Sequence, residues 1–245
     1  MGLSVAAVVL GAGSGRRLSG TNKALLPLAG EPMIAHSLRA LQGVSSISQI
    51  IVVMNPQDQE RLQVEWRVRP QDLGADVVVP GGRERWLSSR AGCQASTPPP
   101  QVVTATDSLL LVHDAARPMV QPGDIQAVIE AAQENGAALL AEPVADTLKS
   151  SGQDSHVLDT VSRDCLWRAQ TPQVARRDWL LEAFARWAEQ RQDNPTDESM
   201  LLEYCGHSPR LVVSSAPNFK VTTQRDLQLA EALLRTTLAA KSSTS

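Results

Sequence analysis

The chain has few cysteines, and those it has are not arranged for a metal site or a disulfide framework. Three cysteines occur in 245 residues, and no two of them stand at C-x-x-C spacing; they are Cys93, Cys165 and Cys205. An odd, scattered set of cysteines is typical of a reducing compartment and argues against a structural zinc site. We therefore expect all three to be small, partly buried core residues.

The sequence also lacks a strong charge imbalance and a long apolar run. The 23 Lys and Arg against 26 Asp and Glu leave a net charge of −3, which does not suggest a nucleic-acid or anionic-membrane binder. The apolar run from Val5 to Leu10 is too short to span a membrane, and no basic segment precedes it as in a signal peptide. We expect no nucleic-acid partner, no membrane partner and a cytoplasmic location.

What the chain does have is an ordinary globular composition and a regular alternation of strand-like and helix-like segments. Apolar residues make up 42% and charged residues 20% of the chain, which is typical of a soluble domain. The length suits one large domain over residues 1–245. The alternation predicts an α/β fold with a mainly parallel sheet.

The predicted elements can be given by their ranges. We expect strands at 5–10, 50–54, 77–79, 109–112, 137–141 and 212–213, and helices at 32–41, 85–95, 122–135, 179–190, 198–204 and 222–240. Residues 61–69 form a polar segment with no predicted element. From about 143 to 170 the pattern changes to short alternating segments around Ser-Gly-Gln-Asp, which predicts a β-hairpin that leaves the main body.

The most informative segment follows the first predicted strand. Three glycines at alternate positions are followed by two arginines and then by Lys23, and the run consists of Leu10, Gly11, Ala12, Gly13, Ser14, Gly15, Arg16 and Arg17. Glycines let backbone N–H groups approach a ligand closely, and a concave run of such groups binds anions. The three cations add positive charge, so we predict a nucleoside triphosphate site.

Two other phosphate-binding motifs fit this segment less well. A dinucleotide fingerprint requires a last glycine where Arg16 stands, and the second strand ends at Asn55-Pro56 instead of a ribose-binding carboxylate. The P-loop spacing is missing from the sequence. A dinucleotide-dependent oxidoreductase therefore remains only as a weaker alternative.

Further candidate residues follow other predicted strands, and ligands of open α/β sheets bind at the carboxyl ends of the strands. The segment that begins His113-Asp114 directly follows strand 109–112. Asp114 could hold Mg²⁺, although a lone Asp in this place is more often a helix cap. Arg117 is its neighbour in the sequence. The loop that follows strand 77–79 has backbone groups that could contact a base and side chains that could reach ribose or phosphate; it contains Gly81, Gly82, Arg85 and Ser88.

The sum of these features favours phosphoryl chemistry. No Ser-His-Asp or Cys-His order stands out, and no paired carboxylates suggest glycoside hydrolysis. Nucleotidyl transfer needs no dedicated base when the nucleophile is an ionised phosphate, because positioning and charge neutralisation supply most of the catalysis. Arg163 and Lys220 are further cations available for a second anion.

Several motifs, taken in order, resemble one family. These are Gly11-Ala-Gly-Ser-Gly-Arg-Arg-Leu, Lys23-Ala-Leu-Leu-Pro, Gly81-Gly-Arg-Glu-Arg, His113-Asp-Ala-Ala-Arg-Pro, Ala141-Glu-Pro-Val-Ala-Asp-Thr-Leu-Lys, Leu166-Trp-Arg-Ala-Gln-Thr-Pro-Gln, Thr196-Asp-Glu-Ser and Asn218-Phe-Lys-Val-Thr. Together they resemble the 2-C-methyl-D-erythritol 4-phosphate cytidylyltransferases of the non-mevalonate isoprenoid pathway, over roughly residues 5–235.

The resemblance implies a Rossmann-like nucleotidyltransferase fold whose β-arm reaches across a homodimer. It implies Mg²⁺ as cofactor and CTP and a polyol phosphate as substrates. Arg17 and Lys23 would be catalytic and would stabilise charge on the α-phosphate. The nucleotide would be bound by Leu10, Gly11, Ala12, Gly13, Ser14, Gly15, Arg16, Gly81, Gly82, Arg85, Ser88, Asp114 and Ala115, with Asp114 also serving the metal. The second substrate would be positioned by Arg117, Thr147, Arg163 and Lys220, and Thr147 and Arg163 would serve the partner's site.

The chain departs from the family pattern near the predicted site. Asn22-Lys23-Ala24 replaces a common Pro-Lys-Gln, and Arg83 replaces an acidic or small residue. Two alternatives stay open beside the predicted activity. One is a ribitol 5-phosphate cytidylyltransferase, which shares the nucleotide motifs, and the other is a non-catalytic nucleotide-binding protein.

Overall fold

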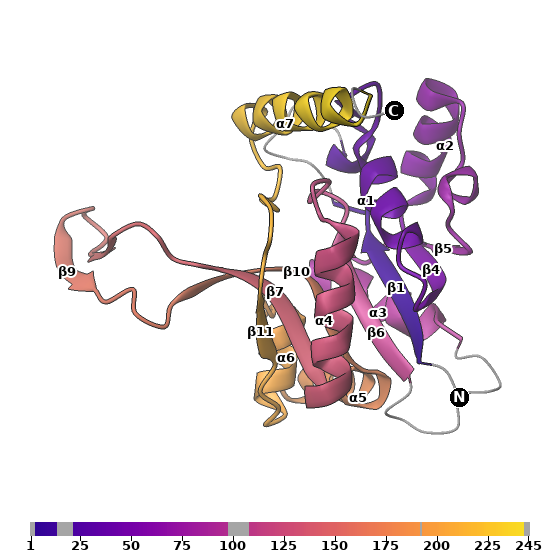
Figure 1. Ribbon diagram of the computed structural model, residues 1–245. Coiled ribbons are helices and arrows are strands. Elements are labelled where there is room, and N and C mark those ends of the chain that lie inside the picture. The colour runs from indigo at the N-terminus through magenta and orange to yellow at the C-terminus, as the bar shows by residue number, and fades with distance from the viewer. Residues whose placement is uncertain (1–2, 14–21, 98–107, 192, 243–245) are drawn as a thin grey trace.

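The computed structural model describes residues 3–13, 22–97, 108–191 and 193–242, with side chains described as far as residue 236. A central sheet with helices on both faces forms the body, and a narrow two-stranded arm extends from it (Figure 1). This arrangement confirms the predicted α/β class. The organisation as a single domain stays a prediction.

The central sheet has seven strands in the order β11-β7-β10-β6-β1-β4-β5. Their bounds are β1 Ser4–Leu10, β4 Ile47–Val53, β5 Val77–Val79, β6 Ser108–Asp114, β7 Ala137–Pro143, β10 Trp167–Arg176 and β11 Arg210–Val213. All neighbours pair in parallel except β10, which runs antiparallel to both β6 and β7. The sheet is therefore mainly parallel, as predicted, but β10 was not predicted.

Strands β1 and β6, near the centre of the sheet, are buried on both faces. Val5, Ala7 and Val9 of β1 pack into one apolar cluster, which includes Leu38 of one helix and Ile129 of another. Ala6 and Val8 pack into a second cluster on the opposite face. The alternation of strand side chains produces the two layers, since neighbouring residues point to opposite faces.

The helices are α1 Met33–Gln42, α2 Pro56–Trp66, α3 Arg85–Ala95, α4 Pro122–Asn135, α5 Arg177–Gln190, α6 Glu198–Tyr204 and α7 Gln224–Ser242, with short 3₁₀ turns at Lys23–Leu25 (η1) and Pro70–Leu73 (η2). Helix α4 ends at Gly136, whose φ of 83° places it in the left-handed region that favours glycine, as predicted. Helix α2 was not predicted; Leu62 is its one buried residue.

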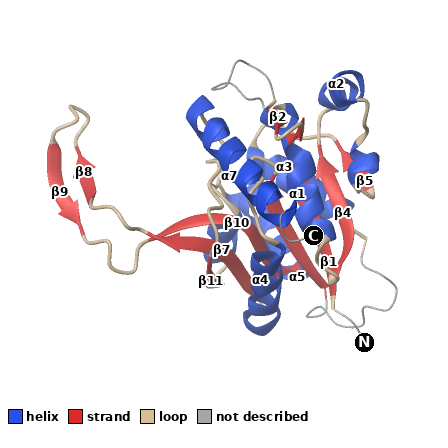
Figure 2. Cartoon of the chain, turned by 45° about the horizontal axis from the view of Figure 1, so that its top comes forward, coloured by secondary structure: helices blue, strands red, loops and turns tan. Residues whose placement is uncertain are grey.

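The arm is formed by β8 Leu148–Ser151 and β9 Val157–Val161, which pair antiparallel. Figures 1 and 2 show it extending away from the body, which confirms the predicted hairpin. Its predicted range of 143–170 is too long, because residues from Trp167 onward belong to β10 of the central sheet. A smaller hairpin, β2 Pro27–Leu28 with β3 Glu31–Pro32, lies next to α7. None of the helices described is both long enough and apolar enough to cross a membrane.

Candidate functional site

A cavity of about 610 Å³ opens at the carboxyl ends of the parallel strands. It is lined by Leu10, Gly11, Ala12, Gly13, Asn22, Lys23, Ala24, Asn55, Gly82, Arg83, Glu84, Arg85, Ser88, Asp114, Ala115, Ala116, Lys220 and Thr222. Leu10 and Asp114 are paired neighbours at the ends of β1 and β6. The cavity thus occupies the edge of the sheet where α/β folds bind ligands.

The structure brings most of the predicted nucleotide-site residues together at this cavity. Predicted residues that line it are Leu10, Gly11, Ala12, Gly13, Lys23, Gly82, Arg85, Ser88, Asp114, Ala115 and Lys220. Thr147 and Arg163 lie on the arm instead, both exposed. Ser14, Gly15, Arg16 and Arg17 fall outside the residues that the structure describes.

Asn22 connects the start of the glycine-rich loop to the turn that carries Lys23. Its Nδ2 donates to the carbonyl of Gly11 at 2.5 Å, and its Oδ1 accepts from the N–H of Ala24 at 3.0 Å. The Lys23 ammonium in turn donates to the carbonyls of Val221 and Thr222 at 3.4 and 3.3 Å. The departure from the family pattern at Asn22 therefore has a structural role that the sequence did not suggest.

The loop that contains Gly81 and Gly82 lies against the start of the glycine-rich loop at the cavity. The N–H of Gly81 donates to Asn55 Oδ1 at 3.1 Å, and that of Gly82 donates to Ser88 Oγ at 3.0 Å. A Cβ on Gly81 would lie 2.3 Å from the Cβ of Ala12, so only glycine permits this approach of the two loops. With both N–H groups engaged, contacts of these glycines to a base would rest on their carbonyl groups.

Asp114 is the centre of a charged network at the cavity wall. Its Oδ1 accepts from Arg85 Nε at 3.1 Å and its Oδ2 from Lys220 Nζ at 2.7 Å. Burial opposes the charged form, but Arg85, Lys220 and Arg117 outweigh it and hold the pKa of Asp114 well below its ordinary value. The carboxylate is therefore ionised and fixed between two cations.

The network continues to a carboxylate that sequence reasoning did not assign to the site. Arg85 Nη1 and Nη2 donate to the two oxygens of Glu198 at 2.8 and 3.0 Å, in the bidentate geometry of strong ion pairs. Glu198 is only 1% exposed. Burial lowers the pKa of Arg85, but the two carboxylates raise it above its ordinary value. The motif Thr196-Asp-Glu-Ser was the one sequence signal that included Glu198.

Arg117 lies beside the network and is held by the backbone. Its Nη1 donates to the carbonyl of Asn218 at 2.8 Å, and its own carbonyl contacts His113 Nε2 at 3.2 Å. The carbonyl of Arg117 can only accept, so His113 Nε2 carries a proton, and Nδ1 of the neutral ring accepts from the Thr171 hydroxyl, 3.1 Å away. His113 is thus neutral and protonated on Nε2, in agreement with burial that lowers the pKa of His113 to about 4.

The predicted metal role of Asp114 stays a prediction. Both of its oxygens are already paired with cations. Within the described ranges, no group of three or more His, Cys, Asp or Glu residues could hold a metal ion. Proteins bind Mg²⁺ through one or two carboxylates together with substrate phosphates. The described side chains thus do not form a magnesium site on their own.

Comparison with known proteins shows the family to which the chain is similar. A model of the family "2-C-methyl-D-erythritol 4-phosphate cytidylyltransferase" matches residues 5–236. A protein of that name from Pelotomaculum thermopropionicum is 42% identical over 234 residues, which cover 94% of both chains. One from Nitrosomonas eutropha is 39% identical over 231 residues, covering 94% of this chain and 96% of its own. The crystal structure of the Thermus thermophilus protein of that name superposes with a TM-score of 0.76 at 31% identity, over 96% of this chain and 100% of that one.

The fold is that of the Rossmann-like nucleotidyltransferases, with a cavity at the carboxyl ends of the parallel strands, where open α/β sheets bind ligands. Within this class, the chain belongs to the 2-C-methyl-D-erythritol 4-phosphate cytidylyltransferase family.

Proposed function

We propose that this chain transfers the cytidylyl group of CTP to 2-C-methyl-D-erythritol 4-phosphate and releases pyrophosphate. Family membership over residues 5–236 supports the activity. The observation that carries it in the structure is the cavity of about 610 Å³, where the first residues of the glycine-rich loop, as far as Gly13, converge with Lys23 and the Asp114 network. A cavity of this volume suits a small ligand such as a nucleotide.

The reaction is an in-line displacement at the α-phosphorus of CTP. An oxygen of the methylerythritol phosphate attacks and forms the new P–O bond, while the bond between the α-phosphorus and the bridging oxygen to the β-phosphate breaks. The electron pair leaves on pyrophosphate, and the product is the cytidine diphosphate derivative of methylerythritol. The attacking phosphate is already ionised, so the protein need only position the reactants and neutralise charge.

Lys23 is proposed to stabilise the charge that builds up on the α-phosphate. Its ammonium lines the cavity and is oriented by the carbonyls of Val221 and Thr222, which precede α7. A cation fixed before the reaction needs no reorganisation when the charge develops. Arg17, outside the described residues, is proposed for the same task on the strength of the family resemblance.

Two further cations are proposed to bind the second substrate. Lys220 lines the cavity, and Asp114 fixes its ammonium at one edge of the site. Arg117 lies next to Asp114 and keeps its guanidinium near Asn218. A phosphate that enters between them would meet positive charge from both side chains.

We propose that Mg²⁺ enters with the triphosphate, as is common for nucleotidyltransferases. Bound there, it would neutralise part of the phosphate charge.

The three cysteines are unpaired thiols, which supports a reducing, cytoplasmic setting for the reaction.

The arm is proposed to join two copies of the chain into a homodimer. Figure 1 shows it reaching away from its own body, and three apolar side chains of β9 are exposed on it: Val157, Leu158 and Val161, by 61%, 72% and 40%. Exposed apolar groups on a projecting hairpin favour burial against another protein surface. In such a dimer, Thr147 and Arg163 would serve the partner's site.

The proposed activity is tested by measuring pyrophosphate release from CTP in the presence of Mg²⁺ and 2-C-methyl-D-erythritol 4-phosphate. We expect release that requires both substrates, with the cytidine diphosphate derivative as the second product. A chain that binds CTP but releases no pyrophosphate with this polyol phosphate would contradict the proposal and favour a non-catalytic nucleotide-binding protein.

A further inference from the structure

Glu198 is a buried carboxylate next to the cavity but not part of its wall. It stands at the first position of α6 and is 1% exposed. The cavity lining includes its partner Arg85 but not Glu198 itself. Any influence of Glu198 on a bound nucleotide must therefore act through Arg85.

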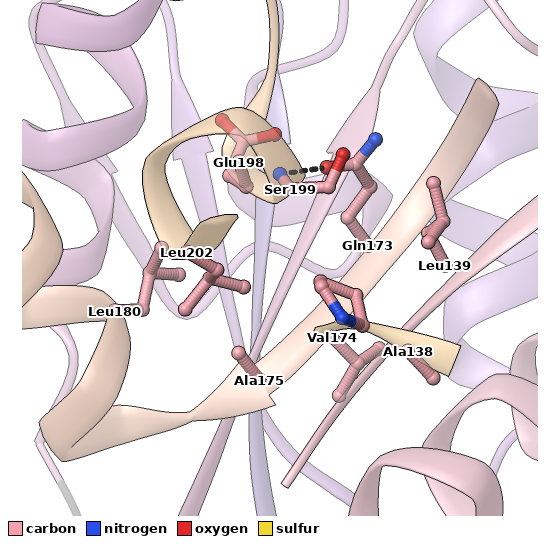
Figure 3. A pocket seen from close by; sticks show the side chains of 10 residues that line it. Ala138, Leu139, Gln173, Val174, Ala175, Leu180, Glu198, Ser199 and Leu202 are labelled. Carbon is pink, nitrogen blue, oxygen red and sulfur yellow. Dashed lines mark hydrogen bonds between the residues drawn. The ribbon is translucent and has the colours of Figure 1, made fainter. Parts of the chain in front are cut away.

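The first turn of α6 is held in place by side chains from neighbouring residues. Asp197 Oδ1 accepts from the N–H of Met200 at 3.0 Å and caps the helix. Gln173 of β10 accepts from the N–H of Ser199 at 2.8 Å and donates to Asp197 Oδ2 at 3.0 Å. Figure 3 shows the Ser199–Gln173 hydrogen bond at the start of the helix. The position of Glu198 is thus fixed independently of Arg85.

Burying the carboxylate of Glu198 at this position costs desolvation free energy. Side chains that are mostly apolar surround the space beneath it, among them Leu180, Leu202 and Val174, and the carboxylate points away from Leu180 and Leu202 (Figure 3). Buried ion pairs generally add little stability compared with apolar residues of the same size. The stability of α6 alone therefore does not account for a carboxylate here.

The carboxylate of Glu198 orients the guanidinium of Arg85. Both terminal nitrogens of the guanidinium donate to Glu198, which leaves Nε directed at Asp114 Oδ1, 3.1 Å away. Asp114 in turn holds Lys220 through its other oxygen. The four groups form a chain of alternating sign, Glu198–Arg85–Asp114–Lys220, with two negative and two positive charges.

We propose that Glu198 is a positioning residue for the nucleotide site. It holds Arg85 so that Arg85 fixes Asp114 at the cavity wall, and it keeps the guanidinium from turning toward the triphosphate. Arg85 is then an organiser of Asp114 more than a direct phosphate ligand, which refines the nucleotide-binding role predicted for it. This inference rests on the proposed function, because it assumes that a nucleotide occupies the cavity.

Glu198→Gln tests the proposal with little change of volume. The amide keeps one acceptor for Arg85 but loses the charge and the second acceptor. We expect the dissociation constant for CTP, measured by calorimetry, to rise by about 10- to 100-fold, the scale of a misplaced positioning group. Glu198→Asp keeps the charge but shortens the side chain, so we expect a smaller rise.

Two control variants separate positioning from general stability. Glu182→Gln makes the same substitution at an exposed helical ion pair with Arg186 on α5, and we expect its CTP affinity to stay within about twofold of wild type. Leu202→Val loosens the packing of α6 without touching Arg85. We expect Leu202→Val to lower Tm while leaving the CTP affinity unchanged.

A double variant tests the route of the effect. If Glu198 acts through Arg85, CTP binding by Arg85→Gln/Glu198→Gln should be no weaker than by Arg85→Gln alone, within about threefold. Unchanged CTP affinity in both Glu198 variants would overturn the inference, as would losses that add in the double variant. The binding readout also separates the two claims, because a chain that binds CTP without turnover contradicts the proposed function and leaves this inference testable.

Discussion

Replacing Asp114 by Asn perturbs the centre of the charged network with almost no change in shape. In the structure, Oδ1 accepts from Arg85 Nε at 3.1 Å and Oδ2 from Lys220 Nζ at 2.7 Å. An amide has one acceptor oxygen, and its NH₂ group would face the second cation donor to donor. Asp114→Asn therefore removes one ionic hydrogen bond outright and weakens the other.

The cost can be estimated from the surroundings of the two cations. Hydrogen bonds to charged groups contribute about 1.5–3 kcal/mol each. Arg85 keeps Glu198 as a partner, and the Lys220 side chain, 39% exposed, can turn toward water. Because neither cation is left buried and unpaired, the loss falls at the low end of the sum. We expect the free energy of unfolding to drop by about 3 kcal/mol.

Equilibrium urea unfolding at pH 7, followed by far-ultraviolet circular dichroism, measures this loss. Asp178→Asn is the matched control, because its ion pair with Arg176 is 2.6 Å long but half exposed, and we expect it to cost less than about 1 kcal/mol. An unchanged m-value would show that the difference lies in stability. A free energy of unfolding for Asp114→Asn that lies within about 1 kcal/mol of wild type, the size expected for an exposed pair, would show that the carboxylate does not organise the two cations.

Three further predictions concern catalysis, acid stability and assembly. Lys23→Ala and Arg17→Ala should each lower kcat for pyrophosphate release by about 10²-fold or more, the scale for loss of one electrostatic stabiliser; near-normal turnover of both would count against their assignment. His113, whose pKa burial lowers to about 4 from 6.5, binds fewer protons in the folded chain than in the unfolded chain between these values. As the pH is lowered through this window, the free energy of unfolding should therefore decrease, by about 2 kcal/mol at pH 5. His113→Gln should lack this part of the decrease when urea unfolding is compared at pH 8 and pH 5. Changing both Val157 and Leu158 to Asp should convert a dimer into a monomer in sedimentation velocity, and a variant that stays dimeric would contradict the role of the arm.

The sequence predicted the parts of the fold that rest on local apolar patterns. The strand 5–10 and the helices 85–95 and 122–135 agree with β1, α3 and α4. Strand 5–10 is a continuous apolar run, and helix 122–135 begins at a proline and is followed by Gly136. Strand β10 was not predicted because its buried residues include the polar Gln170, Thr171 and Gln173, which interrupt the apolar pattern of a buried strand. Polar side chains in a strand are satisfied by partners far away in the sequence, such as Asn218 for Gln170, and no local pattern contains that information.

At the candidate site, too, contacts between residues far apart in the sequence could not be predicted. The glycine-rich loop and Asp114 could be predicted, because the spacing of glycines and the place of a residue after a strand are local features. The pairing of Arg85 with Glu198 could not, since the two are separated by 113 positions in the chain. Asn22, noted in the sequence only as a departure from the family pattern, has contacts with Gly11 and Ala24 that become visible only in the fold.

The proposed activity requires selectivity for both the nucleotide and the polyol phosphate. Pyrophosphate release is followed with Mg²⁺ present while CTP, UTP and GTP are each combined with 2-C-methyl-D-erythritol 4-phosphate and with ribitol 5-phosphate. We predict that CTP with methylerythritol phosphate gives a kcat/KM at least about tenfold above every other pair, a difference of about 1.4 kcal/mol in transition-state stabilisation. A higher kcat/KM with ribitol 5-phosphate, or no release from CTP with either polyol phosphate, would contradict the proposed function.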